Sequence, residues 1–189
     1  MKIIIIMTIL VGLFILAGCS SQSQIEKEYK IGASLSLTGA GSNLGQPTLK
    51  GMEMAVNEIN ANGGINGYKL KVLAQDNKFD LTESVNGVSF LLNTEDPDVF
   101  TSLFTLPTNA VSSILKENQK PLLYEAFSRT VVHDNEYAFK SNFDSISGCE
   151  ELTQYLKDNI KYEKLGVIFA QADYSQECLQ GIKKVEPDV

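Results

Sequence analysis

Three glycines stand in the stretch LSLTGAGSNLGQ, between an apolar run and a helical pattern. Gly39, Gly41 and Gly45 mark a predicted strand-to-helix turn, and glycine-rich turns of this kind bind phosphate groups in dinucleotide-binding folds. The dinucleotide fingerprint needs its third glycine one position earlier and an acidic residue about 20 positions further on. Asp76, the acidic candidate, lies beyond that interval. The spacing therefore disfavours a dinucleotide.

Residue types that carry catalysis or bind metal ions are scarce in this chain. The one histidine, His133, stands in the polar stretch RTVVHDNEY, and we expect it at the surface. It has no nearby partner for Ser-His-Asp or Cys-His chemistry, and one histidine without a cysteine cluster makes no zinc site. The acidic residues around Pro97 lack the ligand spacing of a calcium loop. We expect no enzyme activity, no metal and no cofactor.

The N-terminus has the pattern of an exported lipoprotein. Lys2 precedes an apolar run over residues 3–17, which is short for a membrane span and typical of a signal peptide. The run ends in LAGC, which resembles the bacterial lipobox, whose cysteine is lipidated before cleavage. We expect a signal peptide over residues 1–18, lipidation of Cys19 and a polar tether over residues 19–29. A buried helix with a chance cysteine is the alternative.

Charge and cysteine usage narrow the range of partners. The chain has 16 Lys and Arg against 23 Asp and Glu, a net charge of −7. Such a chain has no electrostatic reason to bind nucleic acid or an anionic lipid surface. About 170 residues follow the signal peptide, the length of one domain. Cys149 and Cys178 could pair in an oxidising compartment, but we favour free buried thiols on two helices.

Strand and helix patterns alternate along the rest of the chain. Strands that alternate with helices of this length indicate parallel βαβ units, with helices on both faces of one sheet. Right-handed crossovers place the strand-to-helix turns at one sheet edge, where ligands bind in open α/β sheets. The predicted strands cover 30–37, a run that ends at Asp76, 98–104, 120–127, an extended segment over 136–143, and 164–170. The predicted helices cover roughly 49–59, 81–93, 108–118, 145–159 and 174–184.

The long stretch IGASLSLTGAGSNLGQPTLKGMEMAVNEINANGGINGYKLKVLAQD resembles the start of type I periplasmic binding proteins, in particular the leucine/isoleucine/valine-binding branch of ABC-transporter receptors. The shared features are a strand that ends in Leu-Thr-Gly, a late glycine, a helix that opens at Gly51 and closes in NEINANGGING, and a strand that stops at Asp76. A fainter likeness continues through KPLLYEAFSRT, YAFKSNFDSISG and KLGVIFAQADYSQE. The resemblance implies an α/β parallel-sheet sandwich with a small ligand held between two lobes.

The resemblance also implies how the chain divides. Residues 30–138 match the first ligand-binding lobe, which is incomplete without a later return segment. Residues 139–189 match the hinge crossing and the start of the second lobe. We therefore expect a truncated chain, from an incomplete gene or a fragment, which alone would not bind ligand with normal affinity.

In the family, three strand-to-helix turns of the first lobe contact the ligand. The resemblance assigns Leu44 of the first turn to a position against the ligand. It assigns Thr105 of the second turn to the hydroxyl that binds the ligand carboxylate, with Leu106 beside it. In the third turn, Ser128 supplies a hydroxyl and an N–H group, and Phe127 supplies a carbonyl.

Further positions carry expectations of their own. Tyr174 matches a second-lobe tyrosine near the cleft. Thr105 and Ser128 could instead only cap the helices that follow them, as such residues often do. Phe127 stands where the family usually has a small residue. This departure, together with others in the second lobe, leaves the ligand class open. Phe79 and Phe104 occupy positions where some members carry a disulfide, and our hypothesis is that their rings pack together.

The function that these features favour is solute binding without catalysis. We expect an extracytoplasmic lipoprotein, in the periplasm or on the outer face of the membrane, that delivers an amino acid or similar small polar molecule to an ABC permease. A sensing receptor of the same fold and a non-functional truncated remnant are the alternatives.

Overall fold

The computed structural model describes residues 28–189, except for the side chains of Val132 and His133. The predicted signal peptide, the lipidation site Cys19 and most of the predicted tether lie outside the described residues. The expected surface position of the His133 side chain also lies outside them. Among residues 28–189, no helix combines the length and the apolar character that a membrane span requires.

Strands and helices alternate from residue 28 to residue 140, as the sequence predicts. The order begins with β1 (Glu28–Leu35), a short 3₁₀ turn η1 (Gly39–Gly41), α2 (Ser42–Ala61), β2 (Lys69–Asp76), α3 (Leu81–Thr94) and β3 (Val99–Leu103). It continues with α4 (Thr105–Glu117), β4 (Leu122–Glu125), α5 (Thr130–His133), β5 (Ala138–Lys140), α6 (Ser145–Tyr155), a π-helical turn η2 (Leu156–Ile160) and α7 (Asp173–Val185). The short helix α5 is not part of the sequence prediction, which left that stretch as a polar loop.

The strands form one parallel sheet in the order β2-β1-β3-β4-β5. The chain runs from β1 outward to β2, then returns past β1 to β3 and continues to the opposite edge. The turns after β1 and β3 therefore lead away from each other at the carboxyl edge of the sheet. Such a switch point is where open α/β sheets bind their ligands.

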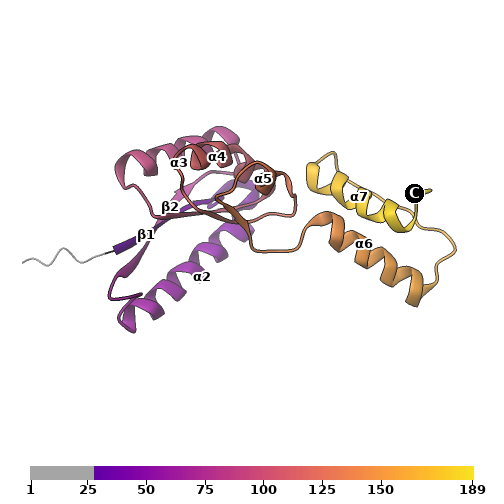
Figure 1. Cartoon of the computed structure of the whole chain (residues 1–189), viewed down its shortest axis with the longest axis horizontal. Coiled ribbons are helices and arrows are strands. Elements are labelled where there is room, and N and C mark those ends of the chain that lie inside the picture. Colours follow the sequence, from indigo (N-terminus) through magenta and orange to yellow (C-terminus); the bar gives the residue numbers. More distant parts are fainter. Residues whose placement is uncertain (1–27) are drawn as a thin grey trace, which may run out of the picture.

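Helices cover the sheet on both faces, with α3 and α4 on one side and α2 on the other (Figure 1). The larger core lies under α3 and α4, around Phe100, Leu115 and Tyr124, which are fully buried. A smaller core lies under α2, around Ala33 and Leu35. These two cores give the α/β sandwich that the sequence predicts.

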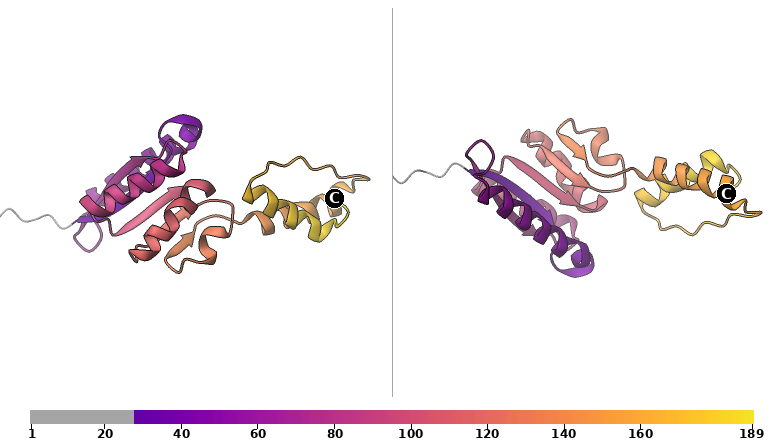
Figure 2. Two further views of the ribbon diagram at one scale, coloured as in Figure 1. Left: turned by 90° about the horizontal axis from the view of Figure 1, so that it is seen from above. Right: turned by 90° about the horizontal axis from the view of Figure 1, so that it is seen from below.

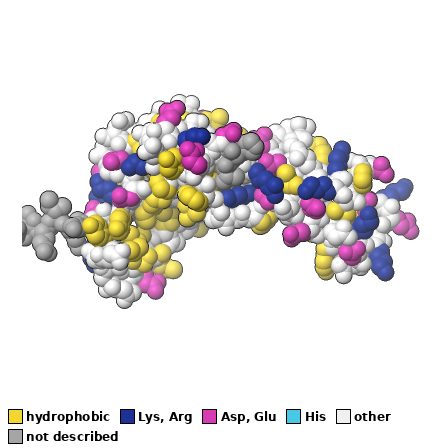
Figure 3. Space-filling view, viewed as in Figure 1, with side chains coloured by type: hydrophobic (Ala, Val, Ile, Leu, Met, Phe, Trp, Pro, Cys, Tyr) yellow, Lys and Arg dark blue, Asp and Glu magenta, His cyan; other side chains and the backbone are white. Residues whose placement is uncertain are grey.

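The face under α2 is only partly covered, because α2 contacts β2 and β1 rather than the strands further along the sheet. Leu123 of β4 and Phe139 of β5 are paired in register and are 50% and 56% exposed. Figure 3 shows apolar side chains gathered over the part of the molecule that holds the sheet. An apolar strip on a sheet face is normally covered by another element.

Helices α6 and α7 lie side by side beyond the end of the sheet (Figure 2) and contact each other more than anything else. Their approach is close because position 181 is a glycine: a Cβ there would lie 2.1 Å from the Ile146 carbonyl oxygen. Asp144 begins α6 by accepting a 3.0 Å hydrogen bond from the Ser147 N–H group, the usual role of an N-cap aspartate.

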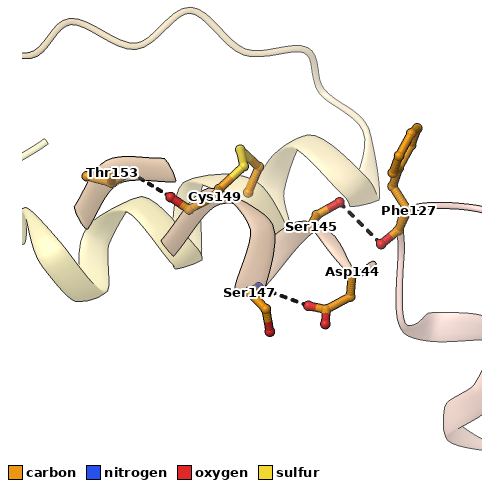
Figure 4. The surroundings of a disulfide bond; sticks show 7 residues. Phe127, Asp144, Ser145, Ser147, Cys149 and Thr153 are labelled. Carbon is orange, nitrogen blue, oxygen red and sulfur yellow. Dashed lines mark hydrogen bonds between the residues drawn. A yellow bond between two sulfur atoms is a disulfide. The ribbon is translucent and has the colours of Figure 1, made fainter. Parts of the chain in front are cut away.

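Two sequence predictions for this part of the chain are wrong. Cys149 and Cys178 form a disulfide rather than free thiols (Figure 4), because the packing of α6 on α7 brings their Cα atoms within 5.2 Å. The predicted strand over 164–170 is an extended segment without strand pairing, and the Ile168 side chain is fully exposed. An alternating apolar pattern becomes a strand only where another strand offers its backbone groups, and none of the strands in the described residues lies beside this segment.

Candidate functional site

The turns that follow β1, β3 and β4 meet the start of α7 around a cavity of about 390 Å³. Its volume is in the range of small-molecule sites, about 300–1,000 Å³. Five of the six predicted ligand-binding residues line it: Leu44, Thr105, Leu106, Phe127 and Tyr174. Ser128, the sixth, does not. The other lining residues are Phe79, Leu103, Phe104, Glu125, Ala126, Asn142, Ala172 and Asp173.

The glycines of the first turn bring α2 close to the end of β1. A Cβ at position 45 would lie 2.0 Å from the Ser36 carbonyl oxygen, and one at position 41 would lie 2.7 Å from the Ser36 Cβ. Gly39 has a φ of +74°, which side chains other than glycine rarely adopt. The glycines are thus required for helix-to-strand packing, and this packing places Leu44, which is half exposed, against the cavity.

Asp76 at the end of β2 fixes the beginning of the first turn. Its carboxylate accepts hydrogen bonds from the N–H of Leu37 at 2.9 Å, from the hydroxyl of Thr38 at 2.6 Å and from the N–H of Lys78 at 2.9 Å. Burial alone would raise the pKa of Asp76, but the hydrogen bonds from Thr38, Lys78 and Leu37 outweigh it and lower this pKa below its ordinary value. A charged Asp76 therefore holds the first turn in place.

Phe79 and Phe104 pack edge to face, with ring centroids 5.1 Å apart and ring planes at 89°. The hypothesis that these two side chains contact each other is confirmed, and both line the cavity. Both residues also have positive φ angles, +61° and +71°. Non-glycine residues adopt such angles at a cost of about 1–3 kcal/mol and do so preferentially at functional sites.

Thr105 is the first residue of α4, and its side chain is 7% exposed. The N-cap of α4 is Phe104, so Thr105 does not cap the helix that follows it. The first N–H groups of a helix have no partner within that helix. Thr105 therefore presents a hydroxyl at the start of α4, next to N–H groups that suit an anionic or carbonyl oxygen.

Ser128 is fully buried, and its hydroxyl donates a 2.9 Å hydrogen bond to the Glu177 carboxylate of α7. The N–H of Arg129 contacts both oxygens of the same carboxylate, at 3.2 and 3.3 Å. The Ser128 hydroxyl also accepts a hydrogen bond from the N–H of Thr130 at 3.1 Å. The hydroxyl predicted to bind ligand thus already holds a carboxylate of the chain itself.

Phe127 contributes its ring to the cavity rather than its carbonyl. The carbonyl oxygen accepts hydrogen bonds from the Ser145 N–H at 3.0 Å and from the Lys140 ammonium at 2.8 Å. Figure 4 shows the Ser145 hydroxyl pointing at the same oxygen, at 3.3 Å. Burial lowers the pKa of Lys140, although the nearby Asp144 and Glu177 charges favour the ammonium form. These bonds join the third turn to the start of α6.

A salt bridge adds to this junction. The Arg129 guanidinium donates a 2.7 Å hydrogen bond to the Asp144 carboxylate and a 3.0 Å bond to the Ser147 hydroxyl. The hydrogen bond from Arg129 holds the pKa of Asp144 well below its usual range. Asp144 therefore caps α6 and anchors Arg129 while it stays charged down to strongly acidic pH.

Sequence reasoning missed three polar residues that line the cavity: Glu125, Asn142 and Asp173. Glu125 is the last residue of β4, so the rule that ligands bind at the carboxyl ends of strands could have found it. Asp173 begins α7 beside Tyr174. The Asn142 Oδ1 atom is buried and has no hydrogen-bond partner among the described residues. Within residues 28–189, no cluster of three or more His, Cys, Asp or Glu side chains is arranged to hold a metal ion.

A sequence profile described as periplasmic binding protein matches residues 28–186. The chain belongs to this family. The periplasmic binding proteins are solute-binding proteins. The match covers the three turns, the disulfide and the start of α7.

Known proteins resemble this chain in sequence or in fold. The Leu/Ile/Val-binding protein of Escherichia coli K12 is 22% identical over 179 residues, which cover 91% of this chain and 48% of that protein. A branched-chain amino acid transporter substrate-binding protein from Streptococcus pneumoniae, solved with isoleucine, superimposes with a TM-score of 0.76 at 22% identity, over 84% of this chain and 46% of that one. A solute-binding protein from Rhodopseudomonas palustris BisB5, solved with 3,4-dihydroxybenzoic acid, has the same TM-score at 13% identity, over 83% and 43% of the two chains. This chain spans about half the length of the relatives it matches, and its fold is that of the type I periplasmic binding proteins.

Proposed function

We propose that this protein is an extracytoplasmic solute-binding lipoprotein of an ABC importer, and that it binds an amino acid or a similar small polar molecule. The observation that carries the proposal is the convergence of Leu44, Thr105, Leu106, Phe127 and Tyr174 on one cavity. These residues come from the starts of α2, α4 and α7 and from the turn after β4, and the first and last of them are 130 positions apart in the sequence.

The lining residues suggest how a ligand is held. The Thr105 hydroxyl and the N–H groups at the start of α4 bind an oxygen of the polar head, and a charge-assisted bond of this kind contributes about 1.5–3 kcal/mol. The apolar side chains of Leu44, Leu106 and Phe127 cover the body of the ligand. Tyr174 approaches from α7 and contributes a ring that has both an apolar face and a polar hydroxyl.

Residues 30–138 act in this proposal as the first lobe and residues 139–189 as the hinge crossing and the start of the second. A ligand that contacts Thr105 on one side and Tyr174 on the other favours the closed arrangement of the two lobes. The exposed strip formed by Leu123 and Phe139 supports the expectation that a return segment completes the first lobe. Lipidation at Cys19 would keep the protein beside a permease in the membrane.

Calorimetric titration of the full-length protein against amino acids, amino-acid amides and short-chain carboxylates tests the proposal. We expect one panel member to bind at one site, and Thr105→Val to weaken it by about 10- to 100-fold, because the hydroxyl bond is lost. Ser113→Ala, on the outer part of α4, is the matched control and should leave binding unchanged. The absence of heat with every compound would refute the proposal.

A further inference from the structure

We propose that Glu177 determines which ligands the cavity accepts, because it fills the Ser128–Arg129 turn with a carboxylate of the chain itself. The ligand class that fits is a small aliphatic compound with a free amino group and a neutral carbonyl, such as an amino-acid amide, in place of a free amino acid. This inference rests on the proposed function, since it names the ligand class of the same cavity.

The contacts at the turn are those that a bound carboxylate would make. Glu177 accepts the Ser128 hydroxyl at 2.9 Å and the Arg129 N–H at 3.2 and 3.3 Å. Ser128 has no exposed surface left for a second acceptor. A ligand carboxylate could bind at Ser128 only by displacing Glu177 and leaving that charge without these donors.

Glu177 is presented by a helix that is firmly held. The next residue, Cys178, is bonded to Cys149 of α6, and Gly181 lies one turn further on, against the Ile146 carbonyl. These contacts hold α7 to α6, so Glu177 cannot leave the turn through a shift of α7 against α6 alone. A rotation of the Glu177 side chain, or a movement of α6 and α7 together, would free Ser128, and either one breaks the hydrogen bonds of the carboxylate to the turn.

The charges around the cavity point to a cationic ligand. Glu125 and Asp173 line the cavity, and no Lys or Arg is among its described lining residues. Asp173 stands one helical turn before Glu177, so the start of α7 directs two carboxylates toward the first lobe. Neither Glu125 nor Asp173 forms an ion pair within residues 28–189. Such a site attracts an ammonium group and repels a free carboxylate.

The neighbouring cations Arg129 and Lys140 are not among the described residues that line the cavity, and each interacts with the Asp144 and Glu177 carboxylates, which offset their positive charge. The Arg129 guanidinium binds Asp144, and the Lys140 ammonium binds the Phe127 carbonyl. Thr105, in contrast, lines the cavity with a hydroxyl that can donate to a neutral carbonyl oxygen. A ligand with an ammonium group, a neutral carbonyl and an apolar body therefore fits each part of the lining.

Four matched probes test the inference by calorimetry near pH 6.5, where amino groups are protonated: leucinamide, leucine, 3-methylbutylamine and 4-methylpentanoate. The proteins are the full-length wild type, Glu177→Gln and Glu177→Ala. Glu150→Gln removes one negative charge from α6, where Glu150 pairs with Lys184, and serves as the control for net charge. Circular dichroism and melting curves check that each variant is folded.

We expect wild type to bind leucinamide at least tenfold more tightly than leucine and to bind 4-methylpentanoate most weakly. In Glu177→Gln the leucinamide-to-leucine ratio should fall at least fivefold, whereas Glu150→Gln should keep it. Glu177→Ala should behave in the same way and rules out an effect peculiar to glutamine. Leucine binding as tightly as leucinamide in wild type, or a ratio that Glu177→Gln leaves unchanged, would overturn the inference and leave solute binding intact. Silence of all four probes with every protein would overturn the inference, and the wider panel of amino acids, amides and carboxylates would then decide the proposed function separately.

Discussion

Loss of the Cys149–Cys178 disulfide should destabilise α6 and α7 without affecting the sheet. The bridge closes a loop between residues that are 29 positions apart. In the chain-entropy description, a loop of this length is worth about 3.6 kcal/mol at 25 °C. The helical pair has no sheet of its own within residues 28–189, and it joins the rest of the molecule through the short polar junction around Phe127 and Arg129. We therefore expect it to open as a separate unit.

Hydrogen exchange followed by mass spectrometry measures this opening directly. In the double variant Cys149→Ser, Cys178→Ser, the protection of amides in α6 and α7 should fall by roughly 400-fold, which is 3.6 kcal/mol at about 1.36 kcal/mol per tenfold change. Amides of β1, β3 and β4 should keep their wild-type protection and provide the internal control. Reductant added to wild type should reproduce the effect, and reductant added to the variant should add nothing.

Two results would refute this reasoning. Protection in α6 and α7 that stays within twofold of wild type would mean that packing alone holds the pair together. An equal loss of protection in the sheet would mean that the pair and the sheet unfold as one cooperative unit.

Three further changes follow from the turns that surround the cavity. Gly45→Ala should lower the melting temperature, because the new Cβ would lie 2.0 Å from the Ser36 carbonyl oxygen, at a cost of about 1–3 kcal/mol; Gly51→Ala, in the same helix with nothing within 4 Å of its added Cβ, should raise it instead. Asp144→Asn should lower stability to urea by a constant amount between pH 7 and about 5, since the lowered pKa keeps wild-type Asp144 charged and stabilising above the ordinary carboxyl range. This difference should shrink only as the pH falls below about 4, toward the folded-state pKa; a difference that vanishes already near pH 6 would contradict the assignment. Lys78→Ala should change neither stability nor binding appreciably, because the ion pair of its ammonium among the described residues is with the exposed Glu83; a tenfold change in affinity would show a role at the cavity.

The sequence was sufficient for the strands of residues 28–140 and for α2, α3 and α4, because each strand there has a partner and each of these helices has an apolar stripe that a sheet face covers. Asp76 ends β2 as predicted, and α3 begins at Leu81 as predicted. The alternating apolar pattern over 164–170 predicts a strand that the structure does not contain. Such a pattern does not indicate whether a partner strand is present beside the segment.

The candidate site was predictable only where local turns determine it. Thr105 and Leu106 follow a strand directly, so the topology alone brings them to the carboxyl edge of the sheet. The pairing of Ser128 with Glu177 spans 49 positions and depends on how α7 meets the third turn. The disulfide likewise depends on the packing of α6 on α7. No local pattern in the sequence predicts the Ser128–Glu177 hydrogen bond or the disulfide.

The convergence of three strand-to-helix turns on one small ligand can be tested most directly by a titration followed by NMR, residue by residue. With a ligand identified by calorimetry, the backbone amides of Leu44, Thr105, Leu106 and Phe127 should shift together and saturate with one dissociation constant. Amides on the outer faces of α3 and α6 should stay unchanged. Shifts that are confined to those outer faces, or that saturate with different constants at the three turns, would contradict a shared binding site.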